Sequence, residues 1–127
     1  MATSPANIVN VTTITGNTTF LTPGNTTANV LLSNAASSTL IYKINQIVCA
    51  NVNGSSAVNA TVAINSLAAG AGTDFPVIST ISVPASASVI AVDKTTAIYL
   101  MENQSIVVTS GTSSGITYTI SYESIQS

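Results

Sequence analysis

Few residues in this chain could do acid–base or nucleophilic chemistry. The 127 residues include two lysines, no arginine and no histidine, and the four acids are scattered as Asp74, Asp93, Glu102 and Glu123. General acid–base catalysis usually needs a histidine or a pair of carboxylates, and a Ser-His-Asp triad cannot form without histidine. A serine with Lys43 or Lys94 is the nucleophilic pair that the composition still allows. No motif frames such a pair, so we predict that the protein is not an enzyme.

Metal and cofactor sites also lack their usual ligands. Cys49 is the single cysteine, so the common zinc sets of cysteine and histidine are absent and we expect Cys49 to be a small buried hydrophobe. A calcium site from Asp74, Asp93 and backbone carbonyls is conceivable, but no D-x-D cluster supports it. Gly70 and Gly72 lie in a small-residue loop without a GxGxxG motif or a P-loop lysine. We expect no metal and no cofactor.

Charge and hydropathy limit the classes of partner. Two lysines cannot neutralise a run of phosphates, which excludes DNA and RNA as direct ligands. Mean hydropathy is +0.51, but no apolar stretch approaches the roughly 18 to 20 residues of a spanning helix, so we expect no membrane insertion. The first residues lack a basic and then apolar segment, so we read no signal peptide.

The scarcity of charge is the most informative bulk property. Charged residues make up 5% of the chain, against about a quarter in typical domains. Either serine, threonine and asparagine hydrate the surface, or partner proteins cover much of it, and we favour both together. Six glycosylation sequons are explained by chance in a chain so rich in these residues, since glycosylation needs a secretory route; they begin at Asn10, Asn17, Asn25, Asn53, Asn59 and Asn103.

The apolar residues alternate with period two, which is typical of strands with one buried face. The pattern is clearest over residues 57–67 and 116–123. We predict that the core includes Tyr118, Ile120, Val62 and Ile64. We predict that their neighbours point outward or lie at contacts, namely Thr117, Thr119, Thr61 and Asn65.

A longer run, residues 40–52, changes its apolar face near Asn45 and Gln46. A β-bulge there would explain the change, and so would burial on both faces. Asn53-Gly54 is the strongest hairpin signal of the chain, and residues 111–115 also predict a hairpin. Residues 67–72 predict a flexible loop, and Gly16-Asn17 predicts a turn.

Together these patterns predict nine or ten short strands and no convincing helix. Closely spaced short strands indicate a sandwich or a barrel. The expected fold is all-β, a single β-sandwich with the jelly roll as one topology, and with an extended N-terminal strand arm. We divide the chain into residues 1–25, an arm or edge strands, and residues 26–127, the β-sandwich domain.

The N-terminal segment is the candidate subunit interface. Its apolar residues stand among many threonines and asparagines, as in an added edge strand, and are Ile8, Val9, Val11, Ile14, Phe20 and Leu21. We expect a homo-oligomer, with a trimer favoured, in which this arm pairs with a neighbour by β-augmentation. The alternative is an intramolecular hairpin of residues 8–14 with residues 18–22.

Several stretches, in this order, resemble a known family. They are VTTITG (11–16), LSNAAS (32–37), YKIN (42–45), ANVNG (50–54), ISVPA (81–85), VDK (92–94), AIYL (97–100) and SYE (121–123). The ordering resembles small virion structural proteins of tailed bacteriophages, particularly those that infect cyanobacteria. Members of that family usually have an acidic Glu-Gly-Asp-type turn where this chain has residues 102–105.

The resemblance implies a virion β-sandwich without enzymatic activity. Within the virion we expect a capsid decoration or cement subunit on the capsid surface, whose main partner is the major capsid protein. A neck or tail component is the first alternative, and a fimbrial or adhesin subunit that binds host glycans is the second.

Overall fold

A computed structural model describes residues 11–126, which form nine strands and one short 3₁₀ helix but no α-helix. The elements are β1 (Thr13–Leu21), β2 (Asn29–Asn34), β3 (Leu40–Asn51), β4 (Val58–Asn65), β5 (Asp74–Val83), β6 (Ser88–Val92), η2 (Lys94–Thr96), β7 (Ile98–Leu100), β8 (Gln104–Ser110) and β9 (Ile116–Gln126). The prediction of an all-β chain is confirmed.

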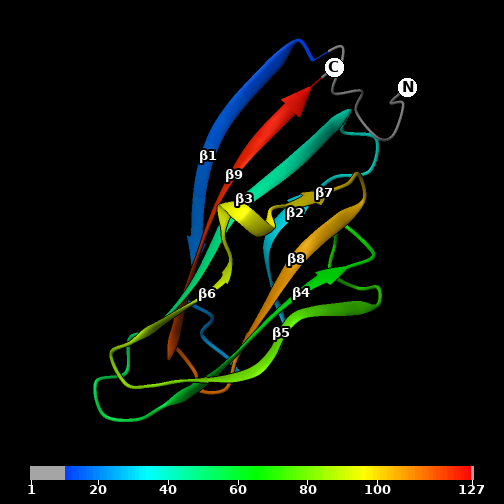
Figure 1. The fold of residues 1–127 in the computed structure, drawn as a ribbon. Coiled ribbons are helices and arrows are strands. Elements are labelled where there is room, and N and C mark those ends of the chain that lie inside the picture. Colours follow the sequence, from blue (N-terminus) through cyan, green and yellow to red (C-terminus); the bar gives the residue numbers. More distant parts are fainter. Residues whose placement is uncertain (1–10, 127) are drawn as a thin grey trace.

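The strands form two antiparallel sheets that pack face to face (Figure 1). The front sheet has the order β1-β9-β3-β6, with β7 also paired to β3, and the back sheet has the order β2-β8-β4-β5. The pairing is nested: the first strand pairs with the last, β2 with β8, β3 with β6 and β7, and β4 with β5. This nesting is the jelly-roll topology of a β-sandwich.

The core lies between the sheets and follows the period-two pattern. Tyr118 and Ile120 of β9 and Val62 of β4 are fully buried, as predicted. Tyr118 also donates its hydroxyl hydrogen to the Thr109 carbonyl, which satisfies the one polar atom of the largest core side chain. Burial of such side chains stabilises the fold by roughly 1.5 to 3 kcal/mol each.

Two predicted positions in β4 need a finer description. Ile64 is half-buried against the core. Asn65 lies on the outward face, opposite Ser105, but is buried to 1% exposure. The cause is the loop after β4, which folds back over this residue and bonds to its side-chain amide, as described below.

The change of face in β3 is a β-bulge. Ile44 pairs with Tyr122 and Gln46 pairs with Ser121, so the register with β9 shifts by one residue at Asn45. A classic bulge places two residues opposite one and re-aims the side chains on either side. Of the two explanations that the sequence left open for residues 45 and 46, the structure shows the bulge.

Both turn-based hairpin predictions are wrong. Residues 52–57, which include Asn53-Gly54, connect β3 of the front sheet to β4 of the back sheet. Residues 111–115 likewise connect β8 to β9 across the sandwich. The side-chain oxygen of Asn53 accepts from Ser55 N at 2.9 Å and from Ser56 N at 3.1 Å, a local turn that serves a crossing between sheets as well as a hairpin.

The predicted intramolecular hairpin at the N-terminus is also wrong over its described part. Residues 13–21 form one unbroken strand, and Gly16 and Asn17 lie in its middle, opposite Glu123 and Tyr122. Nine consecutive pairs with β9 outweigh the local turn tendency, since strand preference depends strongly on context. Residues 1–10 lie outside the described part.

Buried asparagines end three of the strands. Asn34 ends β2, Asn51 ends β3 and Asn65 ends β4, and each is at most 3% exposed. Each side-chain amide donates to two backbone carbonyls of nearby loops or strands at 2.8 to 3.2 Å. A short amide side chain can replace backbone partners where the ladder stops, so these residues position the loops at the strand ends.

Candidate functional site

The outward faces of the two sheets differ in what covers them. The back sheet carries loop 66–73 on its outward face, and the serines of two strands hold this loop down. Ser33 of β2 donates to the Ala68 carbonyl at 2.7 Å, and Ser105 of β8 donates to the Leu67 carbonyl at 2.8 Å.

Packing under loop 66–73 is tight. Val107, on the outward face of β8, is only 3% exposed. Gly70 has a positive φ of 76°, and a Cβ there would lie 2.8 Å from Val30 Cγ2 and 3.3 Å from Val107 Cγ1. Any larger residue would need a disfavoured backbone conformation and would push the loop off the sheet. Residues 67–72, expected to be flexible, are thus packed against the sheet.

The outward face of the front sheet has no such cover among the described residues, and we call it the open face. Near one end of this face a row crosses four strands: Phe20 of β1 lies opposite Thr119, which lies opposite Val48, which lies opposite Ile90. Phe20 is 71% exposed and Ile90 is 55% exposed. Large apolar side chains at both ends of one row make this part of the face apolar and uncharged.

A second apolar row lies near the other end of the open face. Ile14 of β1 lies opposite Ile125 of β9, which lies opposite Ile41 of β3. Ile41 and Ile125 are buried in a small cluster of their own with Val11 and Met101, while Ile14 remains 58% exposed. The open face therefore carries apolar residues at both ends.

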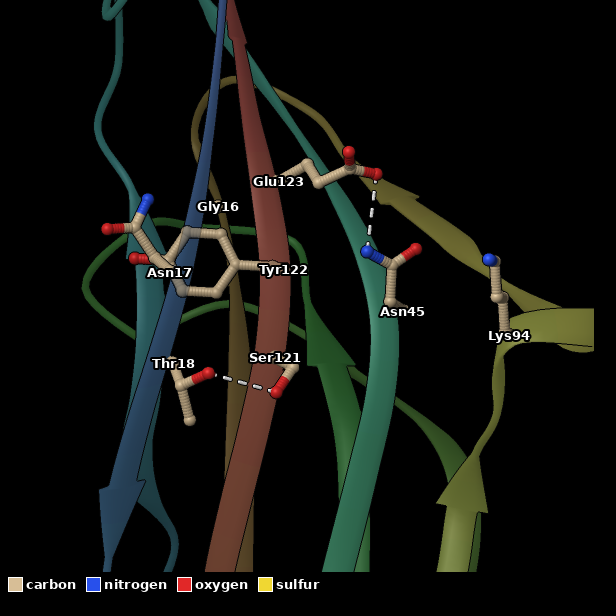
Figure 2. Close-up of a pocket in the computed structure, with 8 residues that line it drawn as sticks. All are labelled: Gly16, Asn17, Thr18, Asn45, Lys94, Ser121, Tyr122 and Glu123. Atoms are coloured by element: carbon tan, nitrogen blue, oxygen red, sulfur yellow. Dashed lines mark hydrogen bonds between the residues drawn. The ribbon is translucent and has the colours of Figure 1, made fainter.

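Between the two rows lies a shallow groove of about 410 Å³, shown in Figure 2. It crosses β1, β9 and β3 and ends at Lys94 of η2. Its lining is polar apart from one glycine and one aromatic ring: Gly16, Asn17, Thr18, Asn45, Lys94, Ser121, Tyr122 and Glu123.

The groove residues are partly bonded to one another. The hydroxyl oxygens of Thr18 and Ser121 lie 3.0 Å apart across β1 and β9, and Asn45 Nδ2 donates to Glu123 Oε1 at 3.2 Å (Figure 2). Asn45 Oδ1 is buried and has no hydrogen-bond partner within the described residues. Buried polar atoms are normally satisfied, so this oxygen at the bulge is an exception.

Each of the four acids serves its local structure. Asp93 caps η2 and accepts from Thr95 N at 2.9 Å. These hydrogen bonds from the Thr95 side chain and backbone lower the pKa of the fully exposed Asp93. The remaining acids accept one bond each from a neighbour: Asp74 from Asn65 at 2.6 Å, Glu102 from Thr39 N at 2.8 Å and Glu123 from Asn45 at 3.2 Å.

Within residues 11–126 the structure forms no group of three side chains that could hold a metal ion. Asp74 and Asp93, the pair considered for calcium, lie at the start of β5 and after β6 and bind different partners. No helix in this part of the chain is long and apolar enough to cross a membrane.

Cys49 and Tyr118 are opposite each other in the core, on β3 and β9. Burial raises the pKa of the Cys49 thiol to about 12. Burial, and then the neighbouring Cys49, also raise the pKa of the Tyr118 hydroxyl well above its usual value. Both groups stay neutral at physiological pH, so Cys49 is a packing residue, with little thiolate character.

The predicted interface residues fall into three groups. Ile14 and Phe20 are exposed on the open face. Val11 and Leu21 are half-buried and pack within their own subunit, against the Ile41–Ile125 cluster and the main core respectively. Ile8 and Val9 lie outside the described residues.

Sequence reasoning missed the groove and the far end of the open face. The groove residues come from four separate segments, and only the register of β1, β9 and β3 brings them together. Ile90 lies in a short strand whose pairing partner was unknown. The alternation of Thr117 and Thr119 did indicate an outward polar face, but not which strands continue it.

Comparison with known proteins adds no family. No family model matches the chain, and no curated protein or solved structure is significantly similar to it.

Proposed function

We propose that this protein is a non-enzymatic structural subunit of a bacteriophage virion, most specifically a capsid decoration or cement protein. The observation that carries the proposal is the open face, where the exposed apolar side chains of Phe20, Ile90 and Ile14 lie in two rows on either side of a polar groove, on a chain with 5% charged residues. Monomeric soluble proteins rarely leave large apolar residues clustered on one face, and such patches mark contacts with other proteins.

Several further features support a structural role. The jelly-roll sandwich is an architecture found in viral capsid and lectin domains. The four acids are occupied in local hydrogen bonds, and the cysteine is buried. The sequence resemblance to small virion proteins of tailed phages points the same way. Partners of this chemistry are other virion proteins, with the major capsid protein first among them.

The mechanism is stabilisation by binding to the assembled state. A subunit that binds across joints between shell proteins, and binds separated shell proteins less well, favours the assembled shell by mass action. Because the row from Phe20 to Ile90 carries no charge, a contact made through it relies on apolar burial and hydrogen bonds. It should therefore be less sensitive to salt than a contact made by ion pairs.

The proposal is tested in phage particles that carry or lack this protein. Reconstructions of the two kinds of virion should differ by density on the shell lattice, and particles that lack the protein should lose infectivity at a lower temperature. Added purified protein should restore heat resistance, whereas a variant with Phe20→Asp and Ile90→Asp should not. The matched control changes Phe75 and Ile81, which are comparably exposed on β5. Difference density at the neck or tail supports that alternative instead, and absence of the protein from purified virions contradicts the proposal.

A second candidate function is favoured by the groove. Thr18, Ser121, Glu123 and Lys94 present hydrogen-bonding groups around a volume of about 410 Å³. Ligand sites commonly combine a concave shape with a few fixed polar groups. This arrangement fits one or two sugar units of a host glycan, as in an adhesin.

A glycan array followed by titration of the best hit tests this second function. Glu123→Gln should weaken sugar binding, while Glu102→Gln, which lies away from the groove lining, should leave it unchanged. Equal binding by both variants, or no binding to any glycan, would contradict the adhesin function and leave the proposed virion structural function.

A further inference from the structure

The four edges of the two sheets differ in how well they resist pairing with another chain. An edge strand exposes unpaired N–H and C=O groups, and proteins usually blunt it with proline, charge, bulges or short length. β5 contains Pro76 and Asp74, its register with β4 shifts twice, and Thr80 has a positive φ of 48°. Its free edge is therefore irregular.

The next two edges are also interrupted. β2 has six residues and a register shift between Val30 and Leu32. At the far edge of the front sheet, β6 has five residues and β7 has three, and η2 separates them. Neither edge offers a long straight row of backbone groups.

β1 has none of these devices. It runs for nine residues in unbroken register with β9, from Thr13 opposite Gln126 to Leu21 opposite Tyr118. It contains no proline, no charged residue and no bulge. A long, regular, uncharged edge is a template for pairing, and its two largest apolar side chains, Ile14 and Phe20, are exposed.

We propose that β1 pairs with β1 of a second copy of this chain, antiparallel and about a two-fold axis at Asn17. This proposal extends the homo-oligomer that we expect for the proposed function, but it does not depend on what the assembly binds. The two front sheets would then join into one continuous sheet with the open faces side by side.

The apolar side chains select both the occupant and the register. When Asn17 faces Asn17 of the partner, Ile14 faces the partner's Phe20 and Phe20 faces the partner's Ile14, on the same side of the sheet. Aromatic and β-branched residues form favourable cross-strand pairs. If the axis is moved by one residue in either direction, Ile14 and Phe20 each lie opposite a threonine, a glycine or a residue outside the strand. The match of the strand to itself is the reason to favour a second copy over an unrelated partner.

This pairing is two-fold and isologous, so it predicts a dimer or a multiple of it in place of the trimer expected from the sequence. An edge-to-edge contact buries less than the about 1,200 to 2,000 Å² of a standard interface. The free protein should therefore dimerise in a concentration-dependent way.

Charge substitutions on β1 test the pairing. Sedimentation velocity up to on the order of 1 mM protein should show a reversible dimer. Ile14→Lys with Phe20→Lys should raise its Kd by about tenfold or more, because like charges then face each other. So should Ile14→Glu with Phe20→Glu, and an equimolar mixture of the two variants should form a heterodimer. The control, Phe75→Lys with Ile81→Lys, has the same six-residue spacing on the blunted edge β5 and should dimerise like the natural protein.

Cysteine cross-linking tests the register. In the proposed dimer Asn17 is the position that faces itself, so Asn17→Cys should form an intersubunit disulfide under mild oxidation. Thr15→Cys should not, since the two cysteines would lie four residues apart along the strands, about 13 Å, beyond disulfide reach. The native Cys49 is fully buried and should not interfere.

The outcomes separate this inference from the proposed function. A chain that stays monomeric over the whole range, a dimer that tolerates both lysine pairs, or equal cross-linking at positions 15 and 17 overturns the β1 pairing. Any of these results together with normal binding to the shell would leave the decoration role standing. If the protein forms the described dimer but is absent from virions, the proposed decoration role is wrong and the β1 pairing stands.

Discussion

The two outward faces of this sandwich arise from the same alternation of strand residues, but a loop covers one face and leaves the other exposed. On the back sheet, Ser33, Ser105 and Asn65 hold loop 66–73 over Val107. On the open face, Phe20 and Ile90 stay exposed at the two ends of a row that crosses four strands.

This difference is the reason we propose the open face as the surface that other chains contact. Covering a sheet face with a loop requires partners for the loop's backbone groups, since unsatisfied buried groups are costly. The back sheet supplies these partners through serines and an asparagine directed at the loop. The front sheet bonds its outward hydroxyls to one another instead, as in the 2.8 Å contact of Thr22 with Thr117. Four changes should sharpen or break this comparison.

The largest effect on stability should come from comparing substitutions on the two opposite faces of strand β9. Ile120 points into the core and Thr119 points onto the open face. Ile120→Ala should lower the free energy of unfolding by roughly 2 to 5 kcal/mol because it leaves a cavity, whereas Thr119→Ala should change it by less than about 0.5 kcal/mol. Urea unfolding followed by circular dichroism measures both. Equal losses would mean that the faces are misassigned.

The next largest effect should come from releasing the cover of the back sheet. The side-chain oxygen of Asn65 accepts from Leu67 N at 3.0 Å and from Gly72 N at 2.9 Å. Asn65→Ala should cost about 2 to 3 kcal/mol, since several partly buried backbone groups lose their partner. Asn59→Ala, at an exposed position of the same strand, is the matched control and should be nearly neutral. A neutral Asn65→Ala would show that the loop is held by other contacts.

Smaller effects on stability should come from replacing one glycine on each side of the sandwich, Gly70 in the loop over the back sheet and Gly16 in β1. Gly70→Ala forces a positive φ and a contact with Val30, so it should destabilise by about 1 to 2 kcal/mol. At Gly16 a Cβ meets nothing within 4 Å, and Gly16→Ala should be neutral or stabilise by up to about 1 kcal/mol, because alanine loses less chain entropy. Thermal unfolding of the two variants should therefore shift in opposite directions, and a shared direction would contradict the comparison.

The smallest effect on stability should come from alkaline pH, through the buried thiol of Cys49 in the core between the two sheets. The pKa of Cys49 is raised from 9.0 to about 12, so the folded state keeps a proton that the unfolded state loses above about pH 9. Stability should be constant below pH 9 and fall above it, by roughly 1 kcal/mol by pH 10, since each unit is worth at most about 1.4 kcal/mol. Cys49→Ala should be flatter between pH 9 and 10, where Tyr118 begins to add its own loss. An identical slope in both proteins would exclude Cys49 as its origin.

The sequence predicted what alternation encodes and missed what strand pairing decides. Tyr118, Ile120 and the bulge at Asn45 follow from local patterns in β9 and β3, because each depends on which side of one strand is apolar. Asn53-Gly54 could not be assigned correctly, since a local turn does not specify whether the next strand pairs or crosses to the other sheet. The outward face of Asn65 was predictable from the alternation, but its burial was not, because it depends on a loop that returns to it.

The candidate site was predictable only in part, for the same reason. Ile14 and Phe20 were selected as interface residues from their types, and they are exposed on the open face. Their relation to Val48 and Ile90, and the groove between the rows, depend on the register of four strands. That register is fixed by long-range contacts, which period-two patterns do not report.

Amide hydrogen exchange along the two longest edge strands tests most directly whether the open face and its β1 edge form a contact surface. Both β1 and β5 are edges of their sheets and are mostly exposed within one subunit. We predict that β1 amides become more protected as protein concentration rises, while β5 amides exchange at a rate independent of concentration. Exchange of β1 that is fast and unchanged over the whole range would contradict the account.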